Sequence, residues 1–253
     1  MTVFVVITLF LMALLLASIE TGRRIRLRHK DQEASSGLGV IDGAVFGLLG
    51  LLLAFAFSGA DSRFEARRQL IVQETNAIGT AWLRVDLLPV AAQSQLRQDY
   101  RQYVDDRIGF YRDLTDDPIK AKADFANSNA LQTKIWSESI AAARQDPSPA
   151  TLSLVLSSLN DMIDITTTRA VALDTHPPLP IYILLFVLAL ASSLIAGFGM
   201  GEQRRRPWLH TVVYAVALTV TIYTILDLEF PRVGIIRIDR YDKALINQRN
   251  SMN

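Results

Sequence analysis

The stretch LGVIDGAVFGLLGLLLAFAFSGADSRFEARRQLIVQETNAIGTAWLRVD, residues 38–86, decides the fold of this chain. Its first part, Leu38 to Ala60, is apolar except for Asp42. A run of about 20 apolar residues can cross a hydrocarbon core of about 30 Å as a helix. Residues 61–86 contain no proline and only one glycine, Gly79, so nothing in them requires a helix to stop. We therefore predict one continuous helix, about 70 Å long at 1.5 Å per residue, that crosses a membrane and extends beyond it.

Three further apolar runs have the same character: Val3 to Ile19, Leu179 to Met200 and Trp208 to Leu228. In the first run the basic residues follow the apolar segment, whereas a signal peptide carries them before it. We therefore predict a retained anchor there, and four membrane helices in all.

The composition excludes several classes of protein. Of 253 residues, 50% are hydrophobic, and the mean hydropathy is +0.24, which is unlike a soluble globule. There is no cysteine, so the chain has no disulfide framework, zinc-thiolate site, iron–sulfur cluster or cysteine nucleophile. A net charge of +1 gives no case for a nucleic-acid partner.

Between the second and third apolar runs lies a water-facing region, residues 61–176, with 13 Lys/Arg and 16 Asp/Glu. Phe64, Ile71, Ile78 and Val85 recur every seven residues at its start, which favours packing against a partner helix. Prolines divide the rest, and we predict three more helices at Ala91 to Leu114, Pro118 to Arg144 and Ala150 to Leu173.

The predicted fold is therefore all-α, with four transmembrane helices and an α-helical extramembrane domain between membrane helices 2 and 3. In the tail, VGIIRID is at most one short extended segment. The domain division is 1–60 for membrane helices 1 and 2 with a basic loop, 61–176 for the helical domain, 177–230 for membrane helices 3 and 4, and 231–253 for the tail.

The second apolar run carries two stripes at helical spacing. Small residues, at steps of 4, 3, 4 and 4, form a narrow groove suited to close helix contact: Gly43, Gly47, Gly50, Ala54 and Ser58. Beside it runs a bulky stripe, Phe46, Leu49, Leu53 and Phe57. Around an oligomer axis this stripe could form an apolar constriction that gates by dewetting, or it could face lipid.

Acidic residues near membranes are costly and often functional, and Asp42 is the best such candidate here. Asp227 and Glu229 lie at the end of the last apolar run, where pairing with Arg232 or a neighbouring arginine is expected. A second acidic face combines Asp161, Asp164 and Thr168 at spacing i, i+3, i+7. Such a face could bind a cation, but a polar face in contact with water or arginine side chains is favoured.

No enzyme motif is found: there is no GxSxG, Walker loop, HExxH or dinucleotide fingerprint. The three histidines, His29, His176 and His210, are far apart in sequence, and His176 is interpreted as a helix-break residue. We expect no catalytic residues, no metal and no cofactor.

Sidedness follows from the basic residues of the short loops. Five Lys/Arg follow the first run, and Arg204, Arg205 and Arg206 follow the third, so both loops should be cytoplasmic. The helical domain, residues 61–176, is then extracytoplasmic. Against this count, Arg63, Arg67 and Arg68 follow the second run and further basic residues lie in the tail.

Four stretches are spread over nearly the whole chain: ETGRR (20–24), residues 43–89, NDMIDITTTRAVALDTHPP (160–178) and ILDLEFPRVGIIRIDRYDKAL (225–245). In these segments the chain resembles a bacterial family of integral membrane proteins known as bestrophin-like, long catalogued as a domain of unknown function. The resemblance implies a bacterial cell-membrane protein with a distant likeness to pentameric anion channels.

By this resemblance, the pore would be lined by the second membrane helix, with a hydrophobic neck around Phe46, Leu49, Leu53 and Phe57. True bestrophins also bind calcium through an acidic cluster, but Asp116–Asp117 and Asp239–Asp242 lack the surrounding pattern. Bestrophin topology would place the helical domain in the cytoplasm, opposite to the loop count.

The function we expect is an oligomeric channel or pore in the lipid bilayer, for inorganic anions, with Arg63, Arg67 and Arg68 concentrating anions at its mouth. The alternative is a non-conducting membrane scaffold or envelope sensor whose helical domain binds a partner. A channel requires a homo-oligomer with the second membrane helix at its axis.

Overall fold

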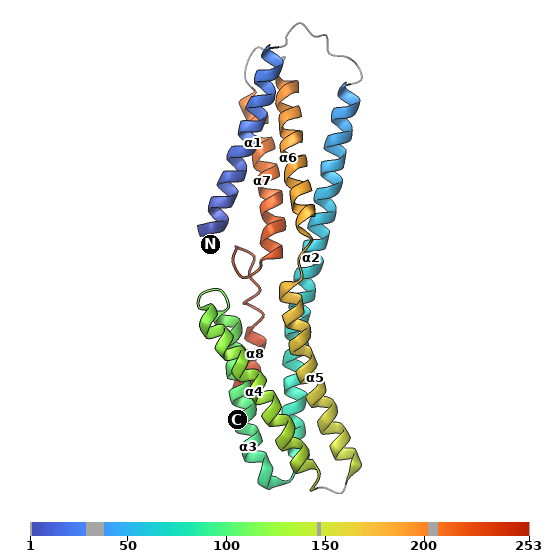
Figure 1. Cartoon of the computed structure of the whole chain (residues 1–253), viewed down its shortest axis with the longest axis vertical. Helices are drawn as coiled ribbons and strands as arrows, with labels where there is room; N and C mark the ends of the chain where they lie inside the picture. Colours follow the sequence, from blue (N-terminus) through green and yellow to red (C-terminus); the bar gives the residue numbers. More distant parts are fainter. Residues whose placement is uncertain (1, 29–37, 146–147, 202–206, 253) are drawn as a thin grey trace. The chain divides into compact units, whose positions relative to one another are not determined.

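The structure is a computed structural model that describes residues 2–28, 38–145, 148–201 and 207–252. Its helices are α1 (Thr2–Arg28), α2 (Leu38–Arg84), the 3-10 turn η1 (Val85–Leu87), α3 (Val90–Asp113), α4 (Pro118–Ala143), α5 (Pro149–Asp174), α6 (Leu179–Met200), α7 (Trp208–Glu229) and α8 (Lys243–Asn250). No strand occurs in the described residues, which confirms the all-α class (Figure 1).

Within the described residues, four helices are long and apolar enough to cross a membrane, and they contain the four predicted runs. The second of them, α2, continues for 47 residues without interruption, as residues 38–86 predict. The helices of the middle region begin and end within one or two residues of the predicted positions, because prolines fix their first turns. Pro118 begins α4 after Asp117, whose side chain accepts a hydrogen bond from the backbone N–H of Lys120.

The chain divides into two compact units. We call Met1–Arg63 with His176–Ile236 the membrane unit, and Phe64–Thr175 with Arg237–Asn253 the helical unit. The tail thus divides between the two, and its last part forms turns followed by α8, a helix that the sequence did not predict.

The core of the membrane unit joins α1, α6 and α7 with the first part of α2. Its most buried members are Leu15, Leu185, Ala189 and Ile222. α1 runs alongside α6, with Arg26 at the end of α1 stacked over the ring of Phe198 near the end of α6 (Figure 1). The basic end of α1 and the C-terminal end of α6 therefore lie at one end of this unit, although the loop residues 29–37 and 202–206 fall outside the described part.

The core of the helical unit is built on the second part of α2. Three members of the predicted stripe, Ile71, Ile78 and Val85, are almost fully buried. Around them pack aromatic residues of α3, among them Tyr100 and Tyr103, with residues of α4, α5 and α8. The seven-residue spacing correctly predicted a helix that packs against other helices.

Candidate functional site

The small-residue stripe of α2 lies on an open surface of the membrane unit. A Cβ atom added at Gly43, Gly47 or Gly50 would meet nothing within 4 Å. Ala54 and Ser58 are exposed as well. Within the described residues, therefore, this face has no packing partner in its own chain.

The bulky stripe of α2 divides between two environments. Leu49 is 4% exposed, and with the partly buried Leu53 it packs against the core of α1, α6 and α7. Phe46 and Phe57 are 36% and 44% exposed and flank the small-residue stripe. The structure thus brings the two phenylalanines to the open face, whereas Leu49 and Leu53 point into the protomer.

Asp42 is half-buried near the beginning of α2. It lies one residue before Gly43, the first member of the small-residue stripe. Its proposed role in the pore stays a prediction.

The end of α7 carries a buried carboxylate. Glu229 accepts a hydrogen bond from Nε of Arg63 on α2 at 2.6 Å, and its other oxygen lies 3.2 Å from Nδ1 of His176. The side chain of Glu229 is fully buried, while those of Arg63 and His176 are 28% and 29% exposed. The expected pairing of this acid with an arginine is present, and the partner comes from α2.

Asp227, two residues earlier on α7, is equally buried but binds backbone. Its carboxylate accepts hydrogen bonds from the N–H groups of Ile235 and Ile236 at 2.9–3.1 Å. At Gly234 an added Cβ would overlap the Asp227 carboxylate, so the turn after α7 requires glycine there. Asp227 therefore fixes the turn after α7 by satisfying its backbone donors.

His176 lies in the non-helical segment between α5 and α6, as expected of a helix-break residue. Its ring stacks on Phe230 with a centroid distance of 4.7 Å. No local pattern indicated that His176 approaches Glu229, because 53 residues separate them.

The three arginines expected at a channel mouth all have partners. Arg63 binds Glu229, as described, and Arg68 binds Glu65 at 2.6 Å and Tyr241 at 3.4 Å. Arg67 is 6% exposed and donates to the carbonyl oxygens of Ala172 and Thr175, at the C-terminal end of α5. Their action on anions stays a prediction, but these contacts give Arg67 a structural task as well.

The acidic face of α5 is a solvent-exposed surface. Asp161, Asp164 and Thr168 are all exposed, and the Thr168 hydroxyl donates to the backbone carbonyl of Asp164. No group of three or more metal-ligating side chains occurs in the described residues.

A buried ionic triad in the helical unit was not predicted from the sequence. Glu74 on α2 is fully buried and accepts from Nε of Arg107 at 2.7 Å and from Arg169. Burial alone would raise the pKa of Glu74, but the charges of Arg107 and Arg169 outweigh it and hold the pKa below its usual value. Arg107 also donates to the Tyr111 hydroxyl at 2.6 Å, and Arg169 stacks over the Tyr111 ring. The triad ties α2, α3 and α5 together.

A tight contact between α1 and α6 was also not predicted. A Cβ added at Gly197 would lie 1.9 Å from the carbonyl oxygen of Ile19, and one at Gly22 would lie 1.9 Å from that of Leu194. Nearby, the Ser18 hydroxyl donates to the carbonyl of Leu190 at 2.8 Å. A signal was present in the sequence, because Ala189, Ser193 and Gly197 form a small-residue stripe with spacing i, i+4, i+8.

Comparisons with known proteins identify the family and a similar fold. Residues 7–241 match the family model of the bestrophin-like domain. The structure is similar to the crystal structure of a variant of a bacterial bestrophin homologue from Klebsiella pneumoniae, with a TM-score of 0.68 and 15% sequence identity over 95% of this chain and 98% of that one. Among curated protein sequences, none matches the chain.

Proposed function

The chain belongs to the bestrophin-like family, and from this membership we propose that it is an oligomeric ion channel in a bacterial cell membrane, conducting inorganic anions. It is a multi-pass membrane protein with four helices of membrane-spanning length. The similar solved protein is described as a bestrophin homologue, which supports the proposal at the level of the fold.

The observation that carries the proposal is the open small-residue face of α2. Gly43, Gly47 and Gly50 meet no atom of the same chain, although α2 is the longest of the described helices. Small residues let helix backbones approach closely in lipid, where apolar burial does not drive association. Copies arranged around an axis near α2 would use this face to pack against one another.

The exposed phenylalanines supply the proposed constriction. Phe46 and Phe57 flank the small-residue stripe and are available to line an axis, while Leu49 supports α2 from the core side. A ring of phenylalanines opposes permeation by dewetting. Among the residues of the bulky stripe, Phe46 and Phe57 are therefore assigned to two separate apolar rings, about 16 Å apart along α2.

Anion preference rests on the basic residues that follow the apolar part of α2. Arg63 and Arg68 are partly exposed, and their contacts with Glu229 and Glu65 offset part of their charge. The field of such residues acts over a Debye length of about 8 Å at physiological salt, so any selectivity they confer should weaken as salt rises.

The test is anion flux into liposomes that contain the purified full-length chain. We expect wild-type flux above that of protein-free liposomes, and several-fold higher flux for Phe57→Ala, which widens the apolar ring. Leu48→Ala, at an exposed apolar position on the side of α2 away from both stripes, is the matched control and should conduct like wild type. If all three give only background leak while remaining folded oligomers, the channel is rejected in favour of the non-conducting scaffold or sensor.

We further propose that the helical unit is extracytoplasmic, because basic residues concentrate at the C-terminal end of α1 and in the segment after α6. The chain has no cysteine, so one introduced thiol reports its side without background. Asn129→Cys suits this purpose because Asn129 is exposed, whereas its neighbour Ser128 is fully buried. We expect an impermeant maleimide to label Asn129→Cys in intact cells, and labelling only after lysis would place the unit in the cytoplasm.

A further inference from the structure

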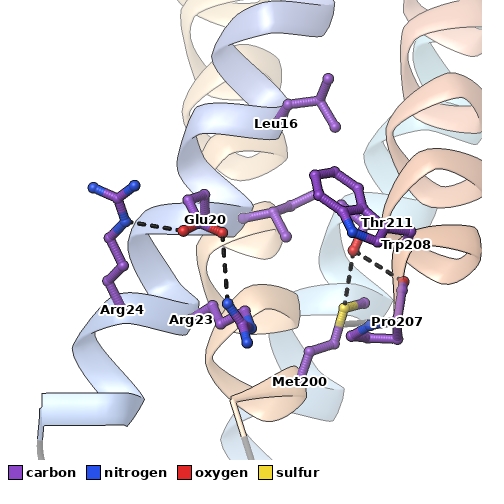
Figure 2. Close-up of a pocket in the computed structure, with 9 residues that line it drawn as sticks. Leu16, Glu20, Arg23, Arg24, Met200, Pro207, Trp208 and Thr211 are labelled. Atoms are coloured by element: carbon purple, nitrogen blue, oxygen red, sulfur yellow. Dashed lines mark hydrogen bonds and ion pairs between the residues drawn. The ribbon is translucent and has the colours of Figure 1, made fainter. Parts of the chain in front are cut away.

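A cavity of about 330 Å³ opens in the membrane unit where α1, α6 and α7 meet. Leu16 and Ile19 supply an apolar wall from α1, and Trp208 and Thr211 line the α7 side (Figure 2). Its polar rim consists of Glu20, Arg23 and Arg24. The cavity therefore combines an apolar interior with a rim of net positive charge.

The sequence places this cavity at the boundary between hydrocarbon and water. Ile19 is the last residue of the first apolar run, and the basic segment begins four residues later at Arg23. On the facing side, Trp208 is 61% exposed and begins the fourth apolar run. Tryptophan and arginine are typical of the level of the lipid headgroups.

The two arginines of the rim differ in their contacts. Nε of Arg24 donates to Glu20 at 2.9 Å, and the Arg24 side chain is 68% exposed. Arg23 reaches the same carboxylate only at 4.0 Å, although its side chain is 14% exposed. Figure 2 shows Arg24 pointing away from Trp208, while Arg23 lies between Glu20 and Met200.

Arg23 has unused hydrogen-bonding capacity. Its Nε is buried, and no acceptor among the described residues satisfies it. A buried donor without a partner is costly, and a guanidinium is best satisfied by a planar pair of oxygens such as a phosphate presents. Glu20 lies 4.0 Å from the Arg23 guanidinium, beyond hydrogen-bond distance, so a further anion can supply the acceptor that Nε lacks.

We propose that this cavity binds the headgroup of an anionic phospholipid, with the phosphate at Arg23 and the glycerol and first methylenes against Leu16, Ile19 and Trp208. The volume is at the lower end of the range for small-ligand sites, which suits a headgroup. The apolar wall favours a lipid over free phosphate, because a free ion would make no favourable contact with the surfaces of Leu16 and Ile19 that line the cavity. This site is separate from the proposed pore and does not depend on conduction.

The experiment is native mass spectrometry of the full-length chain with a phosphatidylglycerol or a phosphatidylcholine of the same acyl chains. We expect the wild type to retain phosphatidylglycerol about tenfold more strongly, because one arginine bonded to the phosphate and a basic rim act together. Arg23→Gln should reduce this preference to about twofold or less, since the remaining rim of Glu20 and Arg24 carries no net charge.

Arg24→Gln is the matched control, because it removes the same charge one residue away on the outer side of Glu20. It should keep most of the preference. Leu16→Trp fills the cavity without changing charge and should also reduce retention, so the proposal stays testable if Arg23→Gln is unstable. Melting temperatures in phosphatidylcholine check that each variant folds.

Three results would overturn the proposal. One is a wild type without preference between the two lipids. Another is an equal loss in Arg23→Gln and Arg24→Gln, which would show only general attraction to a charged surface. The third is displacement of phosphatidylglycerol by millimolar inorganic phosphate, which would assign the cavity to a free anion.

Discussion

The two parts of α2 use similar periodic patterns for opposite purposes. Beyond the membrane run, Ile71, Ile78 and Val85 recur every seven residues and are buried by helices of the same chain. Within the membrane run, Gly47 and Gly50 belong to an equally regular stripe that nothing in the same chain covers. Periodicity therefore shows which face of a helix packs. It does not show whether the partner belongs to the same molecule or to another copy.

The largest loss of stability is expected in the helical unit, where helices of the same chain pack on one another. Glu74→Gln removes the shared acid of Arg107 and Arg169, which leaves two buried positive charges facing each other. Breaking a buried ion pair by removing one partner costs about 3–5 kcal/mol, so the melting temperature of the full chain in detergent should fall by roughly 10 °C.

The matched control is Glu65→Gln on the same helix, where the acid is exposed and binds Arg68 near the surface. This change should leave the melting temperature almost unaltered.

The pH dependence of stability gives an independent check. Because the pKa of Glu74 is lowered on folding, its contribution is complete above its unfolded value of about 4.5 and is lost as pH falls below that value. Glu74→Gln should therefore flatten the acid side of the stability profile, and equal melting of both variants would contradict the triad's role.

The next largest loss of stability is expected at Gly197, where α6 lies against the backbone of α1. Gly197→Ala would place a methyl group 1.9 Å from the carbonyl oxygen of Ile19, so α1 and α6 must move apart. Overpacking of this kind costs about 1–3 kcal/mol. Gly199→Ala, two residues away with nothing within 4 Å, should be neutral or slightly stabilising, because alanine is the better helix former. Thermal melting of both variants in detergent decides this, and equal behaviour would mean that the contact is not tight.

At the open stripe we expect the smallest change in the stability of the protomer. We expect a large change in assembly there. Gly47→Leu should leave melting of the protomer within about 0.5 kcal/mol, because no atom of the same chain lies near it. It should nevertheless dissociate the oligomer, measured by native mass spectrometry. Ala44→Leu, an equally exposed position outside the stripe, should remain oligomeric. An intact oligomer in Gly47→Leu would show that this face contacts lipid.

Local features of the sequence were sufficient to predict most of the helices. Apolar runs marked the membrane helices, and Pro118 and Pro149 marked the starts of α4 and α5. The helix α8 was missed because KALINQRN is short and polar, and its one buried residue, Leu245, gives no periodic signal. Helices of this length depend on tertiary packing more than on propensity.

The candidate site was only partly predictable, because spacing identifies stripes but not what covers them. Phe57 and Leu49 lie in one bulky stripe in the sequence, yet Leu49 is in the core and Phe57 is on the surface. The partners of Glu229 and Glu74 come from helices that are distant in the chain, and no local pattern encodes such pairs.

The contact between α1 and α6 also has a consequence for biosynthesis. Ser18 and Leu190 are 172 residues apart in the chain. At about 5–20 residues per second, roughly 10–35 s of translation separate the two. During that interval α1 must remain in the bilayer without α6, and its apolar run, Val3 to Ile19, is long enough to do so. Gly22, near the level of the lipid headgroups, then lacks its neighbour Leu194 until the ribosome delivers α6, so the first helix made is among the last to be locked in place.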